Sequence, residues 1–103
     1  MKHFIVEIIY KVPFEEFGDA VAAHRTYLSK GYELGMILFS GPQVPRLGGI
    51  LVARAENAQQ LVDFFEKDPY KIRGLADFRF IQFDPVRYQP CLSEWFDDDD
   101  SSA

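Results

Sequence analysis

The chain has 103 residues, of which 48% are apolar and ten are Phe, and this is enough apolar material for the core of one small domain. Its formal net charge is −5, but four of the negative charges lie in the run from Asp97 to Asp100, so residues 1–96 are nearly neutral. Lys and Arg occur singly, and no run approaches the ~20 apolar residues of a membrane-spanning helix. The composition therefore argues against a nucleic-acid partner and against a membrane protein.

The first 31 residues predict a strand followed by a helix. Residues 3–10 alternate as a β-strand does, and the strongly apolar face of this strand consists of Phe4, Val6, Ile8 and Tyr10. Pro13, with two glutamates after it, suits the start of a helix, and Gly31 suits its end. Between them, the apolar stripe of the predicted helix consists of Phe14, Phe17, Val21 and Leu28.

A hairpin is predicted next. Residues 34–39 are apolar on both faces and predict a second strand, in which Ile37 and Phe39 are expected to share one face. The turn Ser40-Gly41-Pro42 is expected to end this strand. Residues 50–53 are then expected to form a buried third strand that pairs with the second.

The remaining elements are a second helix, a short turn and a fourth strand. Asn57 is a favourable N-cap for a helix that ends before Pro69. Asp68 and Pro69 in turn predict the N-cap and first residue of a short helical turn over residues 70–73. Residues 76–83 alternate again and predict the fourth strand.

The element order is therefore βαββαβ, which predicts an α+β, ferredoxin-like fold: a four-stranded antiparallel sheet with two helices on one face. Residues 1–96 are expected to form a single domain whose C-terminal extension begins near residue 85. The aromatic side chains of residues 86–96 suggest that this segment packs on another part of the protein. The acidic residues 97–103 are expected to be a disordered tail.

Two helices cover only one face of such a sheet, and the other face should be polar if it meets water. Here strands two, three and four carry apolar residues on both faces. An uncovered apolar face is rare in a monomer, and a two-fold dimer is the commonest way to bury it. The sequence therefore predicts a homodimer, with the alternative that the C-terminal segment folds back over this face.

His24 is the first candidate for chemistry, because it lies on the apolar stripe of the first helix, three residues after Val21 and four before Leu28. It could be a buried structural histidine or a general base, since imidazole in water titrates near pH ~6.5. Asp68 is the candidate partner, because a capping carboxylate retains acceptor capacity for a histidine N–H. Both predicted helices lie on one side of the sheet, so contact between the two residues is feasible.

The chain resembles the YciI-like (YCII-related) family of the dimeric α+β barrel group. The resemblance spans about residues 4–84 and is carried by three motifs: His24 with Tyr27, Leu28 and Gly31; Ser40-Gly41-Pro42; and Asp68-Pro69-Tyr70. It implies a ferredoxin-like protomer whose sheets pair in a dimer. It also implies a His–Asp pair in a pocket, at His24 and Asp68, and in some relatives lyase or dehydrochlorinase chemistry on small hydroxylated aromatic compounds.

One departure concerns anion binding. Family members often carry an arginine one turn before the histidine, where this chain has Val21, although Arg25 follows the histidine directly. Further residues are expected to hold the substrate, because a general base alone supplies about 10²–10⁴-fold rate enhancement. The candidates are Arg25, Ser40, Gly41, Pro42 and Tyr70, of which the Gly41-Pro42 pair could equally be a plain turn and Tyr70 a packing aromatic.

Other types of site are not indicated. Cys91 has no base near it in sequence, and as the single cysteine it allows no internal disulfide, so a cytoplasmic location is expected. His3 and His24 fit no metal-ligand spacing, and Gly48-Gly49 opens a strand instead of a phosphate-binding helix, so neither a metal nor a cofactor is expected.

Three functions remain open from the sequence. The first is a small lyase-like enzyme in which His24, oriented by Asp68, removes a proton from a small and possibly hydroxylated aromatic ring. The second is a non-catalytic dimeric module that binds a small apolar ligand. The third is a cofactor-free or haem-using oxygenase, as other dimeric barrels are.

Overall fold

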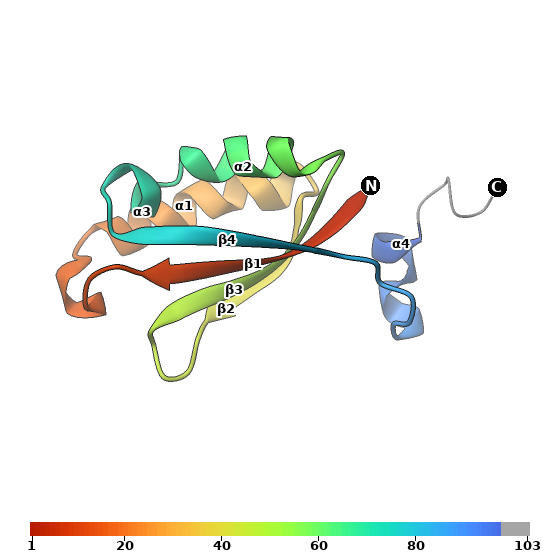
Figure 1. The fold of residues 1–103 in the computed structure, drawn as a ribbon, viewed down its shortest axis with the longest axis horizontal. Helices are drawn as coiled ribbons and strands as arrows, with labels where there is room; N and C mark the ends of the chain where they lie inside the picture. Colours follow the sequence, from red (N-terminus) through yellow and green to blue (C-terminus); the bar gives the residue numbers. More distant parts are fainter. Residues whose placement is uncertain (98–103) are drawn as a thin grey trace.

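The computed structural model describes residues 1–97 as a four-stranded sheet with its main helices on one face (Figure 1). The elements in chain order are β1 (Lys2–Tyr10), the 3₁₀ turn η1 (Phe14–Glu16), α1 (Ala20–Glu33), β2 (Ile37–Pro42), β3 (Gly48–Ala55), α2 (Ala58–Glu66), α3 (Pro69–Ile72), β4 (Ala76–Phe83), the 3₁₀ turn η2 (Pro90–Leu92) and α4 (Ser93–Phe96). The predicted βαββαβ order and the α+β, ferredoxin-like fold are confirmed.

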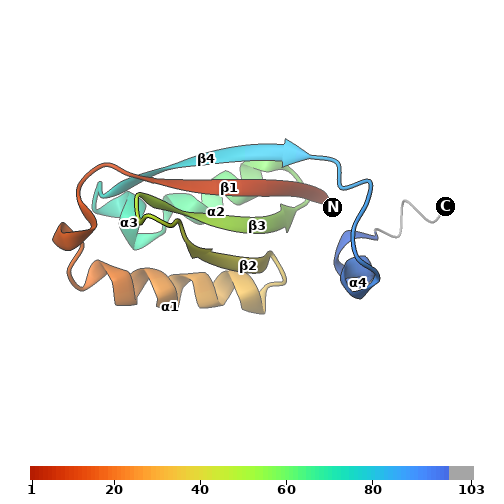
Figure 2. The same cartoon turned by 90° about the horizontal axis from the view of Figure 1, so that it is seen from below.

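The sheet has the strand order β2-β3-β1-β4, and all neighbouring strands are antiparallel. Helices α1 and α2 lie on the same face of this sheet (Figure 1), and in the view from below α2 lies behind the strands while α1 runs beside β2 (Figure 2). Phe4, Val6 and Ile8 of the central strand β1 are buried beneath the helices, as the alternation of residues 3–10 predicts. Leu61 and Phe65 of α2 belong to the same core. Burial of each such side chain contributes about 1.5–3 kcal/mol, and these contacts fix the helices on the sheet.

The start of α1 differs from the prediction. Gly18 has a φ of +53°, a left-handed conformation that does not continue a right-handed helix. The segment after Pro13 therefore forms only the single turn η1, and α1 begins at Ala20. Phe17, between the two, is nevertheless buried in the core, so the predicted apolar stripe is divided between two elements.

The end of α1 also differs. The helix continues through Gly31 to Glu33, so the predicted cap at Gly31 is wrong. Gly31 is buried at a point where any side chain would collide with Ile37 of β2, so its lack of a side chain permits close packing of α1 on β2. The left-handed residue that follows this helix is Gly35, with a φ of +71°.

A β-bulge in β2 overturns the predicted face of Phe39. Ile37 pairs with Ala53, and Phe39 pairs with Val52. The two residues of β2 are two positions apart, whereas their partners in β3 are adjacent, so β2 contains one extra residue at this point. Neighbouring residues of a strand point to opposite faces. Ile37 therefore lies under the helices, whereas Phe39 lies on the opposite face and is 54% exposed. The predicted shared face is wrong because the bulge shifts the alternation by one residue.

The bulge also sets the orientation of the segment from Ser40 to Pro42, which the sequence predicted to end the strand. These residues instead continue β2 and pair with β3. Ser40 is opposite Leu51, so it faces the helices, and its hydroxyl lies 2.7 Å from the hydroxyl of Tyr32 in α1. Without the extra residue, Ser40 would point away from the helices.

The face of the sheet opposite α1 and α2, here called the helix-free face, is partly apolar and partly charged. Its exposed apolar side chains come from three strands and are Ile9, Phe39 and Ile50. Next to β4, a guanidinium nitrogen of Arg79 in β4 lies 3.5 Å from a carboxylate oxygen of Glu7 in β1. The predicted apolar surface is therefore concentrated over β1, β2 and β3, and an ion pair occupies the side next to β4.

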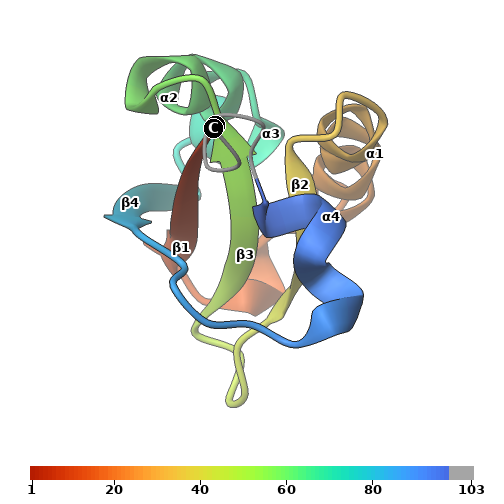
Figure 3. The same ribbon diagram turned by 90° about the vertical axis from the view of Figure 1, so that its right-hand side faces the viewer.

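The C-terminal segment packs against one end of the sheet (Figure 3). The Arg54 guanidinium lies 3.7 Å from the centre of the Trp95 ring and donates a hydrogen bond to the Trp95 carbonyl. The Phe96 ring lies 5.0 Å from the His3 ring. The contacts are at the ends of β1 and β3, so the segment leaves Ile9 exposed. The predicted disorder of residues 97–103 lies outside the described residues, apart from Asp97.

We expect Gly48→Ala to lower the free energy of unfolding by about 1–3 kcal/mol, because the new Cβ would collide with the carbonyl oxygen of Ile8 in the neighbouring strand. A backbone atom inside a sheet cannot rotate aside. Gly41→Ala is the matched control, since nothing lies within 4 Å of its Cβ position. Urea unfolding followed by circular dichroism measures both. Equal midpoints would contradict this close approach of β3 to β1.

Candidate functional site

Asp68 lies at the junction between α2 and α3, and its carboxylate is fully buried. It is the N-cap of α3, as the Asp-Pro sequence predicts, and its Oδ1 accepts a hydrogen bond of 2.8 Å from the backbone N–H of Tyr70. This bond satisfies one of the donors that every helix start leaves unpaired. The carboxylate can accept further hydrogen bonds, and its second donor is a side chain of another helix.

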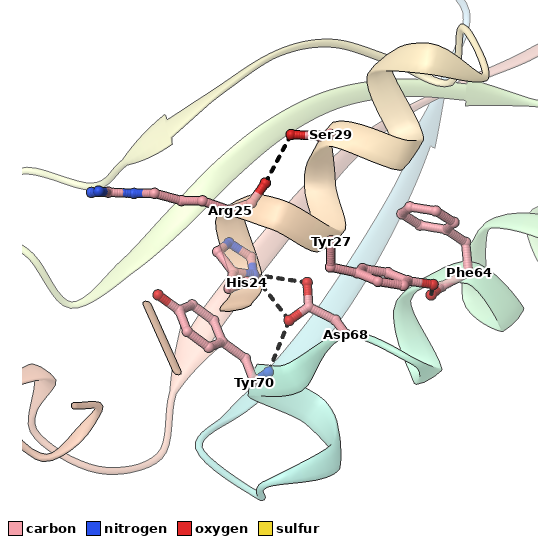
Figure 4. A network of polar contacts seen from close by, with 7 residues as sticks. All are labelled: His24, Arg25, Tyr27, Ser29, Phe64, Asp68 and Tyr70. Carbon is pink, nitrogen blue, oxygen red and sulfur yellow. Dashed lines mark hydrogen bonds and ion pairs between the residues drawn. The ribbon is translucent and has the colours of Figure 1, made fainter. Parts of the chain in front are cut away.

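The second donor to the Asp68 carboxylate is His24 of α1. The Nδ1 atom of His24 lies 2.9 Å from Oδ1 and 2.8 Å from Oδ2 of Asp68 (Figure 4). The two residues are 44 positions apart in the chain and meet because α1 packs against α3. A carboxylate only accepts hydrogen bonds, so Nδ1 carries the hydrogen and Nε2 of a neutral ring has a free lone pair. Figure 4 shows Nε2 on the side of the ring away from Asp68.

Tyr70 covers one face of the imidazole. Its ring stacks on that of His24 with centres 3.9 Å apart and planes inclined by 6°, and only 2% of Tyr70 is exposed. Burial, and to a smaller extent the neighbouring Tyr10, raises the pKa of the Tyr70 hydroxyl, although the positive charges of Arg46 and Arg25 partly oppose the rise. The hydroxyl is therefore protonated at neutral pH and can donate a hydrogen bond.

Tyr27 connects α1 to α2 next to this pair. Its hydroxyl donates a 2.6 Å hydrogen bond to the carbonyl of Phe64, and the two rings lie 4.7 Å apart. Burial raises the pKa of Tyr27, and the negative charge of Asp68 raises it further. The protonated phenol thus secures α1 against α2, and this contact helps to hold His24 in front of Asp68.

A cavity of about 170 Å³ opens beside the imidazole, between α1 and the β2–β3 hairpin. Its apolar wall is formed by Ile8, Leu28 and Leu51, and its polar lining includes Tyr10, His24, Arg25, Arg46 and Tyr70. A cavity of roughly 150 Å³ accommodates benzene, so this one has room for a single six-membered ring.

The structure brings nearly all of the predicted site residues together. His24, Arg25 and Tyr70 line the cavity, as do Ser40, Gly41 and Pro42 of β2. Asp68 lies behind His24 and is shielded from water. Arg25 is exposed, and its side chain extends toward the hairpin and away from Asp68 (Figure 4).

The sequence interpretation missed Arg46 and Tyr10. Arg46 lies in the β2–β3 loop, and its guanidinium carbon is 3.8 Å from the centre of the Phe14 ring. No local pattern marks an arginine in a loop as part of a site. Tyr10 had been assigned to the apolar face of the first strand, which is the face on which the cavity lies, so the alternation of β1 was the available signal.

Within residues 1–97, no three His, Cys, Asp or Glu side chains are close enough together to hold a metal ion. None of the helices in that part of the chain is both long enough and apolar enough to span a membrane. What the site offers chemically is thus an oriented imidazole, a buried carboxylate behind it, two guanidinium groups and an apolar wall.

Comparison with known proteins identifies the family. The model of the YCII-related domain matches residues 1–84. The chain belongs to the YCII-related family. The match ends just after β4, so the C-terminal segment lies beyond the family domain. A comparison with curated proteins returned no match.

One of the solved structures that match in fold is an enzyme complex. It is the 5-chloro-2-hydroxyhydroquinone dehydrochlorinase (TftG) from Burkholderia phenoliruptrix AC1100 in complex with 2,5-dihydroxybenzoquinone. The similarity has a TM-score of 0.60 and 23% sequence identity, and it covers 84% of this chain and 93% of TftG. At this identity the likeness shows a shared fold.

We expect Asp68→Ala to lower the free energy of unfolding by about 2–4 kcal/mol, because it leaves the buried Nδ1–H of His24 and the N–H of Tyr70 without an acceptor. Asp68→Asn should be less destabilising, since an amide oxygen can still cap α3. Asp63→Ala, at an exposed position of α2, is the control and should change stability by less than about 0.5 kcal/mol. Thermal and urea unfolding test the three variants, and equal losses for Asp68→Ala and Asp63→Ala would contradict the prediction.

Proposed function

We propose that this protein is a small lyase-like enzyme, related in chemistry to the dehydrochlorinases, in which His24 is the general base and Asp68 is its partner. The observation that carries the proposal is the orientation of the His24 imidazole, with one nitrogen toward Asp68 and the ring against the cavity. Nδ1 donates to a buried carboxylate, and the ring lines a cavity large enough for a single aromatic ring. A histidine with only a structural role has no need of an adjacent cavity.

In the proposed reaction, Nε2 of His24 takes a proton from an acidic C–H or O–H of a small hydroxylated ring. The reacting form is the keto tautomer of such a ring, in which the carbon that carries the leaving group is tetrahedral; removal of an O–H proton gives the enolate that forms this tautomer when a carbon is protonated. From the keto tautomer, the electron pair of a C–H bond next to the leaving group forms a new π bond in the ring, and a leaving group such as chloride departs with the pair of its own bond. Asp68 stabilises the imidazolium that results, as the aspartate does in the Ser-His-Asp arrangement. The fold shared with TftG, a dehydrochlorinase solved with a hydroxylated quinone, supports this substrate class.

We also propose that the protein is a homodimer formed through the helix-free face. Phe39, Ile50 and Ile9 together make an exposed apolar surface over three strands, and the C-terminal segment leaves it open. Burying apolar surface of this kind contributes about 25 cal/mol per Å². Ile50 is adjacent to Leu51, which lines the cavity, so the dimer contact would lie on the opposite side of the sheet from the proposed site.

We expect His24→Gln to lower the turnover of chlorinated hydroxyquinols by about 10²–10⁴-fold, because glutamine keeps a hydrogen-bonding side chain but cannot take up a proton at neutral pH. Chloride release across a panel of such compounds measures the rate. Asp68→Asn should reduce turnover in the same direction. Ser29→Ala, which removes an exposed hydroxyl of the same helix, is the matched control and should retain full activity.

A substrate turned over equally well by the His24→Gln variant would exclude His24 as the base. Binding of ring compounds without turnover by the unmodified protein would favour the alternative, a non-catalytic module that holds a small apolar ligand in the same cavity.

We expect Phe39→Asp to shift the protein from dimer to monomer, because it places a charge in the apolar part of the helix-free face. Sedimentation equilibrium at micromolar concentration measures the mass. The matched control is Ile72→Asp, since Ile72 is also an exposed large apolar residue but belongs to α3 instead of the sheet. A monomeric mass for the unmodified protein would disprove the dimer, and a dimeric mass for Phe39→Asp would place the interface elsewhere.

A further inference from the structure

The cavity beside His24 carries positive charge that no carboxylate of its lining balances. Two guanidinium groups line it, Arg25 from α1 and Arg46 from the β2–β3 loop, and none of its lining residues is Asp or Glu. Within residues 1–97, neither of these arginines forms an ion pair. Arg73 and Arg79, in contrast, are paired with Asp19 and Glu7.

Arg46 is held in place by uncharged groups. Its guanidinium carbon lies 3.8 Å from the centre of the Phe14 ring, and its Nε donates a 3.4 Å hydrogen bond to the hydroxyl of Tyr10. A ring face and a phenol orient the guanidinium without neutralising it. The group is also half-buried, so its charge is less screened than that of an exposed arginine. Arg46 is therefore ordered in advance of any ligand, with its two terminal nitrogens still able to donate.

Both guanidinium charges act on the same part of the cavity. Each of them lowers the pKa of the Tyr70 hydroxyl, Arg46 more than Arg25, against the effect of burial. The Tyr70 ring is also the one that stacks on His24. An anionic group in this cavity would thus be attracted by both positive charges.

The apolar wall defines the rest of the ligand. Leu28 and Leu51 are almost completely buried, and Ile8 lies beside them on the same lining. A flat apolar body fits such a wall, and the volume of about 170 Å³ has room for a single ring. A guanidinium fork matches the two oxygens of a carboxylate, or an ionised oxygen on the ring.

We infer that this cavity takes its ligand as a single-ring anion, whose charged oxygen is bound by Arg46 together with Arg25 while the ring lies on the wall formed by Ile8, Leu28 and Leu51. Arg46 is then a specificity-determining residue of the site. The inference rests on the proposed function, because it concerns the same cavity. It requires only binding, so it can be tested without turnover.

Isothermal titration calorimetry of the full chain with benzoate and with benzamide tests the inference, because the two rings have nearly the same shape and differ in charge. We expect benzoate to bind at least 10-fold more tightly than benzamide. Arg46→Gln should weaken benzoate binding by about 10–100-fold, the equivalent of one charge-assisted interaction of about 1.5–3 kcal/mol, and leave benzamide binding unchanged. The benzoate affinity of Arg46→Lys should lie between those of the unmodified protein and of Arg46→Gln, because lysine keeps the positive charge but lacks the two parallel donors of a guanidinium.

Arg79→Gln is the matched control, because it removes a guanidinium from the helix-free face and should leave benzoate binding unchanged. Melting curves of each variant verify that it is folded. A second titration series under alkaline conditions, with para-nitrophenolate and its neutral methyl ether, distinguishes an ionised ring oxygen from a carboxylate as the preferred group. Equal affinity for charged and neutral rings in both series would overturn the inference, as would no detectable binding of either anion or an Arg46→Gln variant that binds benzoate normally.

These outcomes separate the inference from the proposed catalysis. Selective binding of an anion that depends on Arg46, together with no turnover of any compound, would uphold the anion site and reject the lyase. Turnover that depends on His24, with no effect of Arg46→Gln on affinity or on KM, would uphold the lyase and reject the anion site.

Discussion

Asp68 is buried where α1, α2 and α3 meet, and its carboxylate accepts hydrogen bonds from the start of α3 and from His24 of α1. A buried carboxylate without partners would be strongly destabilising, so these donors are a condition of the fold. The bond from His24 also determines that Nδ1 is the ring nitrogen that carries the hydrogen. The structural role of Asp68 as a cap and the tautomer of the imidazole thus follow from one electrostatic requirement.

The cavity depends on a second constraint, which is the bulge in β2. The bulge turns Ser40 toward the helices and Phe39 toward the helix-free face. It therefore supplies part of the cavity lining on one side of the sheet and a large exposed ring on the other. The proposed site and the proposed dimer surface are two consequences of one extra residue, which explains why both lie along the β2–β3 hairpin.

The C-terminal segment is attached differently from the rest of the chain. It begins after the part that matches the YCII-related domain, and its contacts involve side chains at the ends of β1 and β3. A cation stacked on an indole and a hydrogen bond to a carbonyl hold Trp95 in place. These contacts are remote from His24, so the segment extends the domain without entering the cavity.

The elements, and the roles that depend on neighbours along the chain, can be predicted from the amino-acid sequence. The alternation of β1, the N-caps Asn57 and Asp68, and the position of His24 on the buried side of its helix all follow from spacings of two to four residues. The family resemblance added the expectation that His24 and Asp68 are paired.

Features that depend on contacts between distant parts of the chain become visible in the folded protein alone. The bulge beside Phe39 and the place of Arg46 at the cavity have no local signature, because each is selected by what it packs against. The bond between His24 and Asp68 joins residues 44 positions apart, and its length is fixed by the packing of α1 on α3. Spacing along a chain encodes which face a side chain takes, whereas packing between elements decides which side chains meet.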